Sequence, residues 1–318
     1  MKKLALCFLL TSSTILLNAQ SNQQQHKSVD EFVVKVGALD SQNVAQITEA
    51  LTLGFSDKQQ KARAIFYWIA NNIALDAKAI KINDQRKILP EEVIKNRKAT
   101  GLGFAKLFQE MSSLANIRCL VVDGYVKNNI DDLNEPADEV NHAWNVVQLG
   151  PSPDLWYYVD AARAAGALDK KMSIFEKDFT SAYFFANRAL FNLNHFPDNS
   201  AWQLGPGPKG IKEFYSLPLF YNAAFLYDIK KPTPATGFIK TKSKAKVNFS
   251  IPYGAPGAST VELVIGTGRQ QQKPEAMNFN LTGGAIVFSY QFKTEDSYPV
   301  RVVIDGKPVL EYMVESSE

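Results

Sequence analysis

The stretch "RKATGLGFAKLFQEMSSLANIRCLVVDGYVK", residues 97–127, decides the fold because it predicts a helix followed directly by a strand. Two glycines, Gly101 and Gly103, open the helix, and neither carries a side chain that can take part in a reaction. The apolar residues that follow recur at steps of three and four, which is typical of one buried helix face: Phe104, Leu107, Phe108, Met111 and Leu114. The run "CLVVDGYV", residues 119–126, is apolar and β-branched, which predicts a central strand.

The sequence before this stretch is helical in pattern. In "KARAIFYWIANNIALD", residues 61–76, apolar residues again recur at helical steps, which predicts a buried stripe: Ala62, Ile65, Phe66, Ile69 and Ile73. The sequence therefore places helices ahead of the first long strand.

Two strand-like runs follow, "HAWNVVQL" (142–149) and "LWYYVD" (155–160), joined by the turn "GPSPD". If paired residues have numbers that add up to an even value, His142 and Asp160 lie on the same face of the sheet, within reach of each other. An odd value places them on opposite faces. The spacing alone leaves both registers open.

A carboxylate that holds one imidazole nitrogen leaves the other nitrogen available as a base, which is half of a catalytic triad. The other half is a nucleophile, and a thiol at a helix N-terminus would suit because the helix dipole lowers its pKa. The helix that begins near Gly101 is the natural place for such a thiol, and the sequence has none there.

Four blocks in this order make the chain resemble the transglutaminase-like superfamily, in particular the kyphoscoliosis-peptidase and cytokinesis-protein group. They are the two stretches already quoted, "NHAWNVVQLGPSPDLWYYVDA" (141–161), and "HFPDNSAWQLG" (195–205) followed by "FYSLP" (214–218). The resemblance implies an α+β, papain-like domain with N-terminal helices and an antiparallel sheet. His142 and Asp160 match the family's histidine and aspartate, whereas Gly101 occupies the position of its nucleophilic cysteine. After Asp160 the chain also departs from the family's common Asp-Ala-Thr-Trp.

Other residues are poor replacements for the missing thiol. Thr100 is one position away, a rotation of about 100° around a helix, and a hydroxyl needs stronger activation than a thiol. Cys119 has apolar neighbours and is expected to be an inert core residue. His195 belongs to a motif that we interpret as structural.

For the ligand cleft we predict Gly101 and Trp144 as binding residues beside the remnant pair His142 and Asp160. Trp156 is expected to pack in or around the sheet. With three histidines and one cysteine outside the first twenty residues, the sequence predicts no metal site and no cofactor.

Composition and patterning give the remaining expectations. The first nineteen residues, with Lys2, Lys3 and an apolar run, predict a cleaved export signal and thus a periplasmic or extracellular protein without a transmembrane segment. A polar lead-in over 20–40, a transglutaminase-like domain over 41–220, a Pro- and Gly-rich linker over 221–235 and an immunoglobulin-like β-sandwich over 236–318 complete the predicted organisation. A net charge of +3 without a basic run gives no sign of nucleic-acid binding.

The leading hypothesis is a protein that has lost catalysis and binds a protein, a peptide or a cell-envelope polymer. The alternative is a cysteine-independent protease, amidase or acyl-transfer enzyme that uses His142 and Asp160. The oligomeric state does not follow from the sequence.

Overall fold

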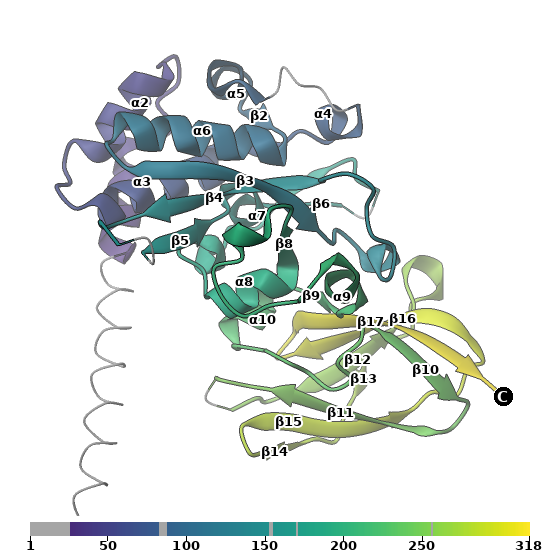
Figure 1. The fold of residues 1–318 in the computed structure, drawn as a ribbon. Helices are drawn as coiled ribbons and strands as arrows, with labels where there is room; N and C mark the ends of the chain where they lie inside the picture. The colour runs from purple at the N-terminus through teal and green to yellow at the C-terminus, as the bar shows by residue number, and fades with distance from the viewer. Residues whose placement is uncertain (1–25, 83–87, 153–154, 170, 256) are drawn as a thin grey trace, which may run out of the picture. The chain divides into compact units, whose positions relative to one another are not determined.

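The computed structural model describes residues 26–82, 88–152, 155–169, 171–255 and 257–318 (Figure 1). The chain divides into two compact units: unit 1 comprises Met1–Val121 and Trp144–Phe179, and unit 2 comprises Val122–Ala143 and Thr180–Glu318. The export signal predicted over 1–19 lies outside the described residues. The domain boundaries predicted at 41, 220 and 236 stay predictions.

Unit 1 is mainly helical. Residues 26–36 form a helix, followed by α2 (Val44–Thr52), α3 (Lys58–Asn72), α4 (Ala77–Lys81), α5 (Pro90–Asn96), α6 (Gly101–Leu114) and α7 (Ala161–Ala165). Two short pairings complete unit 1, the parallel pair β1 (Ala74–Leu75) with β2 (Lys98–Ala99) and the antiparallel pair β6 (Gly166–Leu168) with β7 (Phe175–Lys177).

The stripe predicted for α3 is buried, and the burial extends further around the helix than the spacing indicates. Arg63 is 1% exposed and donates to both carboxylate oxygens of Asp30, at 2.7 and 2.6 Å. This ion pair ties α3 to the N-terminal helix of residues 26–36. Trp68 on α3 is also fully buried.

The polar lead-in predicted over 20–40 needs correction for its second half, because residues 26–36 are helical and Val29 and Val33 are buried. His26 is half-buried beside Arg63 and Asp30 and not simply solvated. Burial and the Arg63 charge lower the pKa of its imidazole, while Asp30 acts in the opposite direction. Because the segment is mostly polar, its composition did not indicate that Val29 and Val33 are core residues.

A four-stranded sheet supports the candidate site. Its order is β5 (Trp156–Val159), β4 (His142–Gln148), β3 (Arg118–Val126) and β8 (His195–Pro197), so the prediction of a central strand over 119–126 is confirmed. In unit 1, α6 packs along β3 and β4 (Figure 1). The Asn145 amide of β4 donates to the Ala105 carbonyl of α6 at 2.9 Å, and the Gln109 amide of α6 donates to the Cys119 carbonyl of β3 at 3.2 Å.

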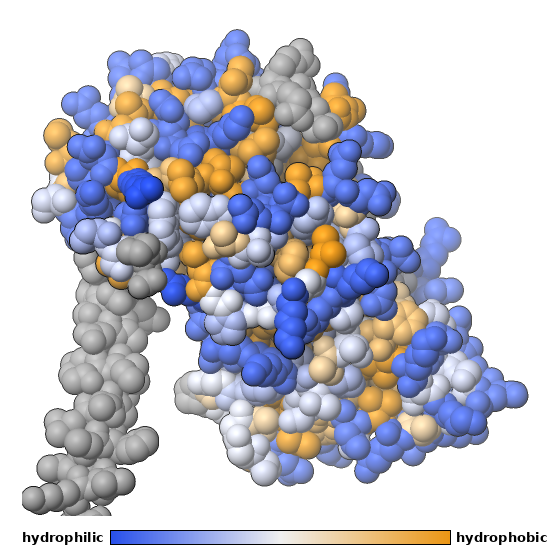
Figure 2. All heavy atoms as spheres, in the orientation of Figure 1, coloured by the Kyte–Doolittle hydropathy of each residue, from blue (hydrophilic) through white to orange (hydrophobic). Residues whose placement is uncertain are grey.

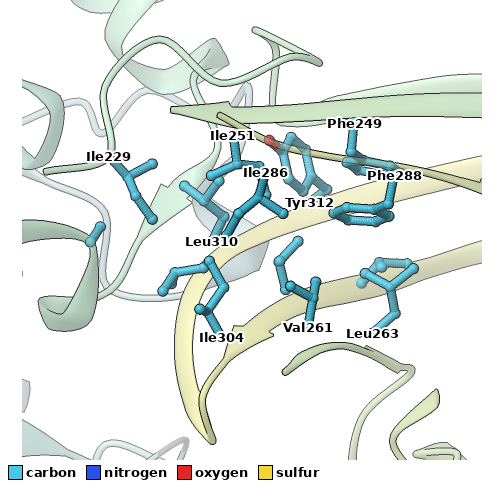
Figure 3. Close-up of a cluster of buried hydrophobic side chains, with 14 of the residues drawn as sticks. Ile229, Phe249, Ile251, Val261, Leu263, Ile286, Phe288, Ile304, Leu310 and Tyr312 are labelled. Carbon is cyan, nitrogen blue, oxygen red and sulfur yellow. The ribbon is translucent and has the colours of Figure 1, made fainter. Parts of the chain in front are cut away.

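Unit 2 contains the predicted C-terminal β-structure. One sheet has the order β10 (Phe238–Lys242), β17 (Lys307–Ser317), β16 (Asp296–Ile304), β12 (Val261–Ile265) and β13 (Glu275–Ala276), and β9 (Leu219–Phe220) also pairs with β17. The other has the order β11 (Lys246–Pro252), β15 (Ala285–Gln291) and β14 (Asn280–Thr282). Figure 3 shows apolar side chains from both sheets meeting in one core, with Phe249 and Phe288 stacked at 4.8 Å. This arrangement is consistent with the predicted sandwich.

Residues of the segment 221–235, for which the sequence predicts a linker, contribute to this core. The segment contains α10 (Asn222–Leu226), and Ala224 and Ile229 are fully buried among the sandwich residues. The Tyr221 hydroxyl donates to Glu311 at 2.6 Å, and Arg301 pairs with the same carboxylate at 3.0 Å. The Pro- and Gly-rich composition predicts an irregular backbone, but the apolar residues of the segment are fixed by tertiary packing. Two further helices of unit 2 are α8 (Arg188–Asn194) and α9 (Ile211–Ser216).

The surface alternates in polarity. On the face that Figure 2 shows, hydrophobic residues lie in small groups among hydrophilic ones. Within the described ranges, no helix has the length and apolar character that crossing a bilayer requires.

Candidate functional site

The start of α6 has the geometry of a capped helix N-terminus. Thr100 is the N-cap residue in an extended conformation, and its hydroxyl accepts a hydrogen bond from the Gly103 amide at 3.3 Å. Gly101 is the first helical residue, as the sequence predicts. Because the Thr100 hydroxyl serves as the cap, its geometry argues against a nucleophilic role for this residue.

Cys119 lies on β3, packed against α6. Burial raises the pKa of its thiol to about 12, although hydrogen bonds with Ser112 and Asn145 act in the opposite direction. A thiol with such a pKa is protonated near neutral pH, and only the thiolate is an effective nucleophile. The prediction that Cys119 is inert therefore gains a physical reason.

The register between β4 and β5 resolves the alternative that the spacing left open. Asn145 pairs with Val159 and Gln148 with Trp156, so the numbers of paired residues add up to an even value. The ladder ends at Asn145 and Val159; one more step in the same register would pair Trp144 with Asp160, and His142 is two residues further along the unbroken strand β4. His142 and Asp160 thus lie on the same face of the sheet in a diagonal arrangement.

Asp160 has a structural task as well. It is the N-cap residue of α7, is 1% exposed, and accepts a hydrogen bond from the Arg163 amide through Oδ1 at 2.9 Å. That contact fixes the carboxylate orientation. A buried carboxylate requires such partners because desolvation of its charge is costly.

His195 joins this face from β8. It pairs with Val126 of β3, and the Asn141 side chain binds the amide and the carbonyl of Val126 at 2.9 and 3.0 Å. Since His142 follows Asn141 directly, both histidines are held close to the same residue of β3. Their ring centroids are 5.7 Å apart.

The environment of His195 fixes its tautomer. Nδ1 lies 3.3 Å from the Phe191 carbonyl oxygen, and because a carbonyl only accepts, Nδ1 is the protonated nitrogen. The ring also stacks on Phe191 with centroids 3.8 Å apart and an interplanar angle of 11°. The structural role predicted for His195 is consistent with these contacts.

Within unit 2 the structure brings His142 and His195 together, whereas the sequence interpretation treated the histidines as scattered and predicted no metal site. No spacing rule could have found this proximity, because it depends on β8 pairing with β3 across about seventy residues of chain.

Trp144 is 1% exposed and packs within the structure, and Trp156 is 8% exposed with the Arg118 guanidinium over its ring. The packing predicted for Trp156 is confirmed. So deeply buried, Trp144 offers little surface to a ligand. The ligand role of Gly101 and Trp144 stays a prediction.

Helices ahead of an antiparallel sheet, a capped helix start, a histidine that begins β4 and an aspartate that directly follows β5 are features of a papain-like α+β domain. Residues 45–161 match the family model of the transglutaminase-like superfamily. The chain therefore carries a domain of the transglutaminase-like superfamily, in agreement with the fold that its sequence predicts.

Curated relatives agree with this assignment. Kyphoscoliosis peptidase of Mus musculus is 30% identical over 230 residues, which cover 71% of this chain and 33% of that protein. Hillarin of Drosophila melanogaster is 21% identical over 305 residues, 92% of this chain and 34% of that protein, and cytokinesis protein 3 of Schizosaccharomyces pombe is 29% identical over 169 residues, 53% and 18% respectively. The chain spans at most about a third of these proteins.

A solved structure described as "Crystal structure of a TGase" is 18% identical, covers 55% of this chain and 41% of that chain, and superimposes with a TM-score of 0.28. A TM-score this low carries no argument about function.

Proposed function

We propose that this protein is a transglutaminase-like protein without thiol catalysis that acts by binding a protein, a peptide or a cell-envelope polymer. One observation carries the proposal: the helix start at Gly101 has a capped, intact geometry and bears no side chain. The alternative thiol, Cys119, has a pKa raised to about 12. A scaffold of this family without a nucleophile can still hold a ligand.

The proposal is tested by comparing the native chain with Gly101→Cys. Both are incubated with a glutamine-containing peptide and an amine donor, and separately with an alkylating peptide probe, and the labelled residue is mapped by mass spectrometry. We expect labelling at position 101 in Gly101→Cys alone. The same variant with Cys119→Ser is the matched control for labelling at the other thiol.

The alternative function is hydrolysis or acyl transfer without a cysteine that uses His142 and Asp160, and the even register of β4 and β5 favours it. In that case the native chain would turn over the peptide, and His142→Ala would abolish the reaction. This outcome would overturn the binding proposal. Retention of a ligand by both the native chain and His142→Ala, without turnover, would support it.

Export is a further part of the proposal and is supported by Lys2, Lys3 and the apolar run that follows them. Fractionation of cells and N-terminal sequencing of the recovered protein test it. We expect a chain that starts near Gln20 outside the cytoplasm. A full-length chain in the cytoplasm would contradict export.

A further inference from the structure

We propose that β14 (Asn280–Thr282) is a self-association edge through which two copies of this chain pair, strand against strand, about a two-fold axis at Leu281. This inference goes beyond the proposed function and is independent of it, because a dimer can form with or without a bound ligand. It rests on the position of β14 in its sheet, on the uncharged sequence of this edge, and on the side chains around Leu281.

β14 is the last strand of the three-stranded sheet of unit 2, whose order is β11-β15-β14 (Figure 1). It pairs with β15 on one side, where Leu281 lies opposite Ile286, and all three of its residues are exposed. Among the described strands of unit 2, none lies on its other side. An open edge of this kind can accept a further strand, whose main-chain hydrogen bonds contribute the affinity.

The turn between β14 and β15 decides which backbone groups face the open edge. It has two residues, Gly283 and Gly284, with φ of 60° and 74°, as in a type I′ turn. In such a hairpin the two residues that flank the turn, Thr282 and Ala285, form a hydrogen-bonded pair, and the next pair along the ladder does not. The N–H and C=O of Leu281 therefore point away from β15, toward the open edge.

The sequence of this edge lacks the features that usually prevent strands of different molecules from pairing. Lysine, proline and a covering segment are common protections of an edge strand. The outer strand β10 carries Lys240 and Lys242, and the Ser250 backbone of the outer strand β11 is bonded to that of Thr233 at 2.8 and 2.9 Å. By contrast, residues 276–292 contain no Asp, Glu, Lys, Arg or Pro. One copy of β14 can therefore face another without opposing like charges.

The side chains around Leu281 suit an antiparallel pairing of two identical strands. With the axis at Leu281, the two copies exchange two backbone hydrogen bonds there, and Phe279 of one copy lies opposite Gly283 of the other. Glycine leaves room for the aromatic ring. On the other face of the strand Asn280 lies opposite Thr282, and both of these side chains can form hydrogen bonds.

Leu281 supplies the apolar part of the contact. Its neighbour on β15, Ile286, is fully buried, so the Leu281 side chain lies on the core side of the sheet, yet it is 48% exposed. Two such leucines placed side by side cover each other at the rim of both cores. Because β14 is short, the contact is smaller than the usual interface of about 1,600 Å², and we expect a weak dimer with a micromolar dissociation constant.

Association is tested with the untagged full chain by sedimentation equilibrium, from micromolar to near-millimolar protein concentration. We expect a monomer–dimer equilibrium that Leu281→Lys weakens by about 10-fold or more, because two like charges then meet at the axis. Leu281→Glu should act alike, and an equimolar mixture of the two variants should associate again. Gln271→Lys adds the same charge at an exposed position outside β14 and should dimerise as the native chain does.

Hydrogen exchange gives a second measurement that needs no substitution. Amide exchange over residues 278–282 of the native chain should slow as the protein concentration rises, because pairing protects the edge of β14. Exchange over Phe238–Lys242, which form the outer strand β10, should stay the same and is the internal control.

The proposal is overturned if the native chain stays monomeric over this range, or if exchange over 278–282 does not depend on concentration. It is equally overturned if Leu281→Lys leaves the dimer unchanged, if Gln271→Lys weakens it as much, or if the mixture of Leu281→Lys and Leu281→Glu does not associate. Labelling of Gly101→Cys does not require association, so failure of one proposal does not imply failure of the other.

Discussion

Two helices of unit 1, α6 and α7, begin with a similar N-cap, but their cap residues differ in charge and in burial. At α6, Thr100 caps the helix through a hydrogen bond of 3.3 Å from the Gly103 amide; at α7, Asp160 does so through one of 2.9 Å from the Arg163 amide. Thr100 is half-buried and neutral, whereas Asp160 is 1% exposed. A threonine cap is enough to start a helix, so the carboxylate at α7 exceeds what capping requires.

The two helix starts differ in the groups that they could contribute to a reaction. The α6 start has the backbone amides and the dipole of a helix N-terminus, and its first residue, Gly101, has no side chain. The α7 start retains a buried carboxylate on the same sheet face as His142, and burial of a carboxylate is costly unless it is well partnered. Under the proposed function, any chemistry that the domain performs would therefore depend on the sheet and not on the long helix.

The largest effect is expected for Asp160→Ala. Loss of the cap and of a buried hydrogen bond to a carboxylate should lower the free energy of unfolding by about 2–3 kcal/mol. Asp160→Asn keeps an oxygen for the Arg163 amide and should lose less than half of that. Urea unfolding followed by circular dichroism measures both. An Asp160→Ala variant as stable as the native chain would show that the cap contributes little.

The C-terminal end of α9 can be compared with these two helix starts, because the buried side chain of Lys127 binds its last carbonyls. Lys127 is 4% exposed, and its ammonium donates to the Phe214 and Leu217 carbonyls at the end of α9, at 2.7 and 3.0 Å. Burial lowers the pKa of its amine to about 7, with Asp132 acting in the opposite direction. An amine whose pKa is lower in the folded chain than in the unfolded chain adds stability as pH rises through the interval between the two values.

For this reason Lys127→Met should become less stable relative to the native chain as pH rises from 7 to 9. The difference in unfolding free energy should grow by about 2 kcal/mol over these two units, because each unit corresponds to about 1.4 kcal/mol at most. Urea unfolding at pH 7, 8 and 9 measures it, and Lys246→Met, which removes an exposed amine, is the control. A constant difference across this range would mean that Lys127 keeps its proton throughout.

A smaller effect is expected for Thr100→Ala. Removal of the α6 cap should cost about 1 kcal/mol, at the lower part of the usual range because the hydrogen bond is long. Thr100→Ser retains a hydroxyl and should be close to the native chain in urea unfolding. A loss as large as that of Asp160→Ala would contradict the distinction between the two starts.

The smallest effect is expected for Gly101→Ala. Alanine at the first helical position should raise the free energy of unfolding by about 0.5 kcal/mol, because glycine loses more backbone entropy on folding. Thermal unfolding measures it, with Ala105→Gly in the same helix as the reciprocal change. A clear destabilisation would indicate that the space at position 101 is occupied in the native protein.

Much of the fold was accessible from the sequence because it depends on local patterns. The helix start at Gly101, the central strand over 119–126 and the C-terminal strands follow from periodicity and turn residues. The segments 26–36 and 221–235 were harder, since their composition is polar or rich in Pro and Gly while a few residues, such as Val29 and Ile229, are buried. The composition of a segment does not reveal a few buried residues within it, because tertiary packing decides which of its side chains are buried.

The sequence by itself determined the transglutaminase-like domain, the order of its elements and the absence of a thiol at the helix start, since these depend on neighbouring residues. Only the tertiary structure decided the register that brings His142 and Asp160 to one face and the pairing of β8 with β3 that adds His195. Strand register and the contacts of distant segments are set by the packing of the whole sheet, and a one-residue shift reverses the face of every side chain.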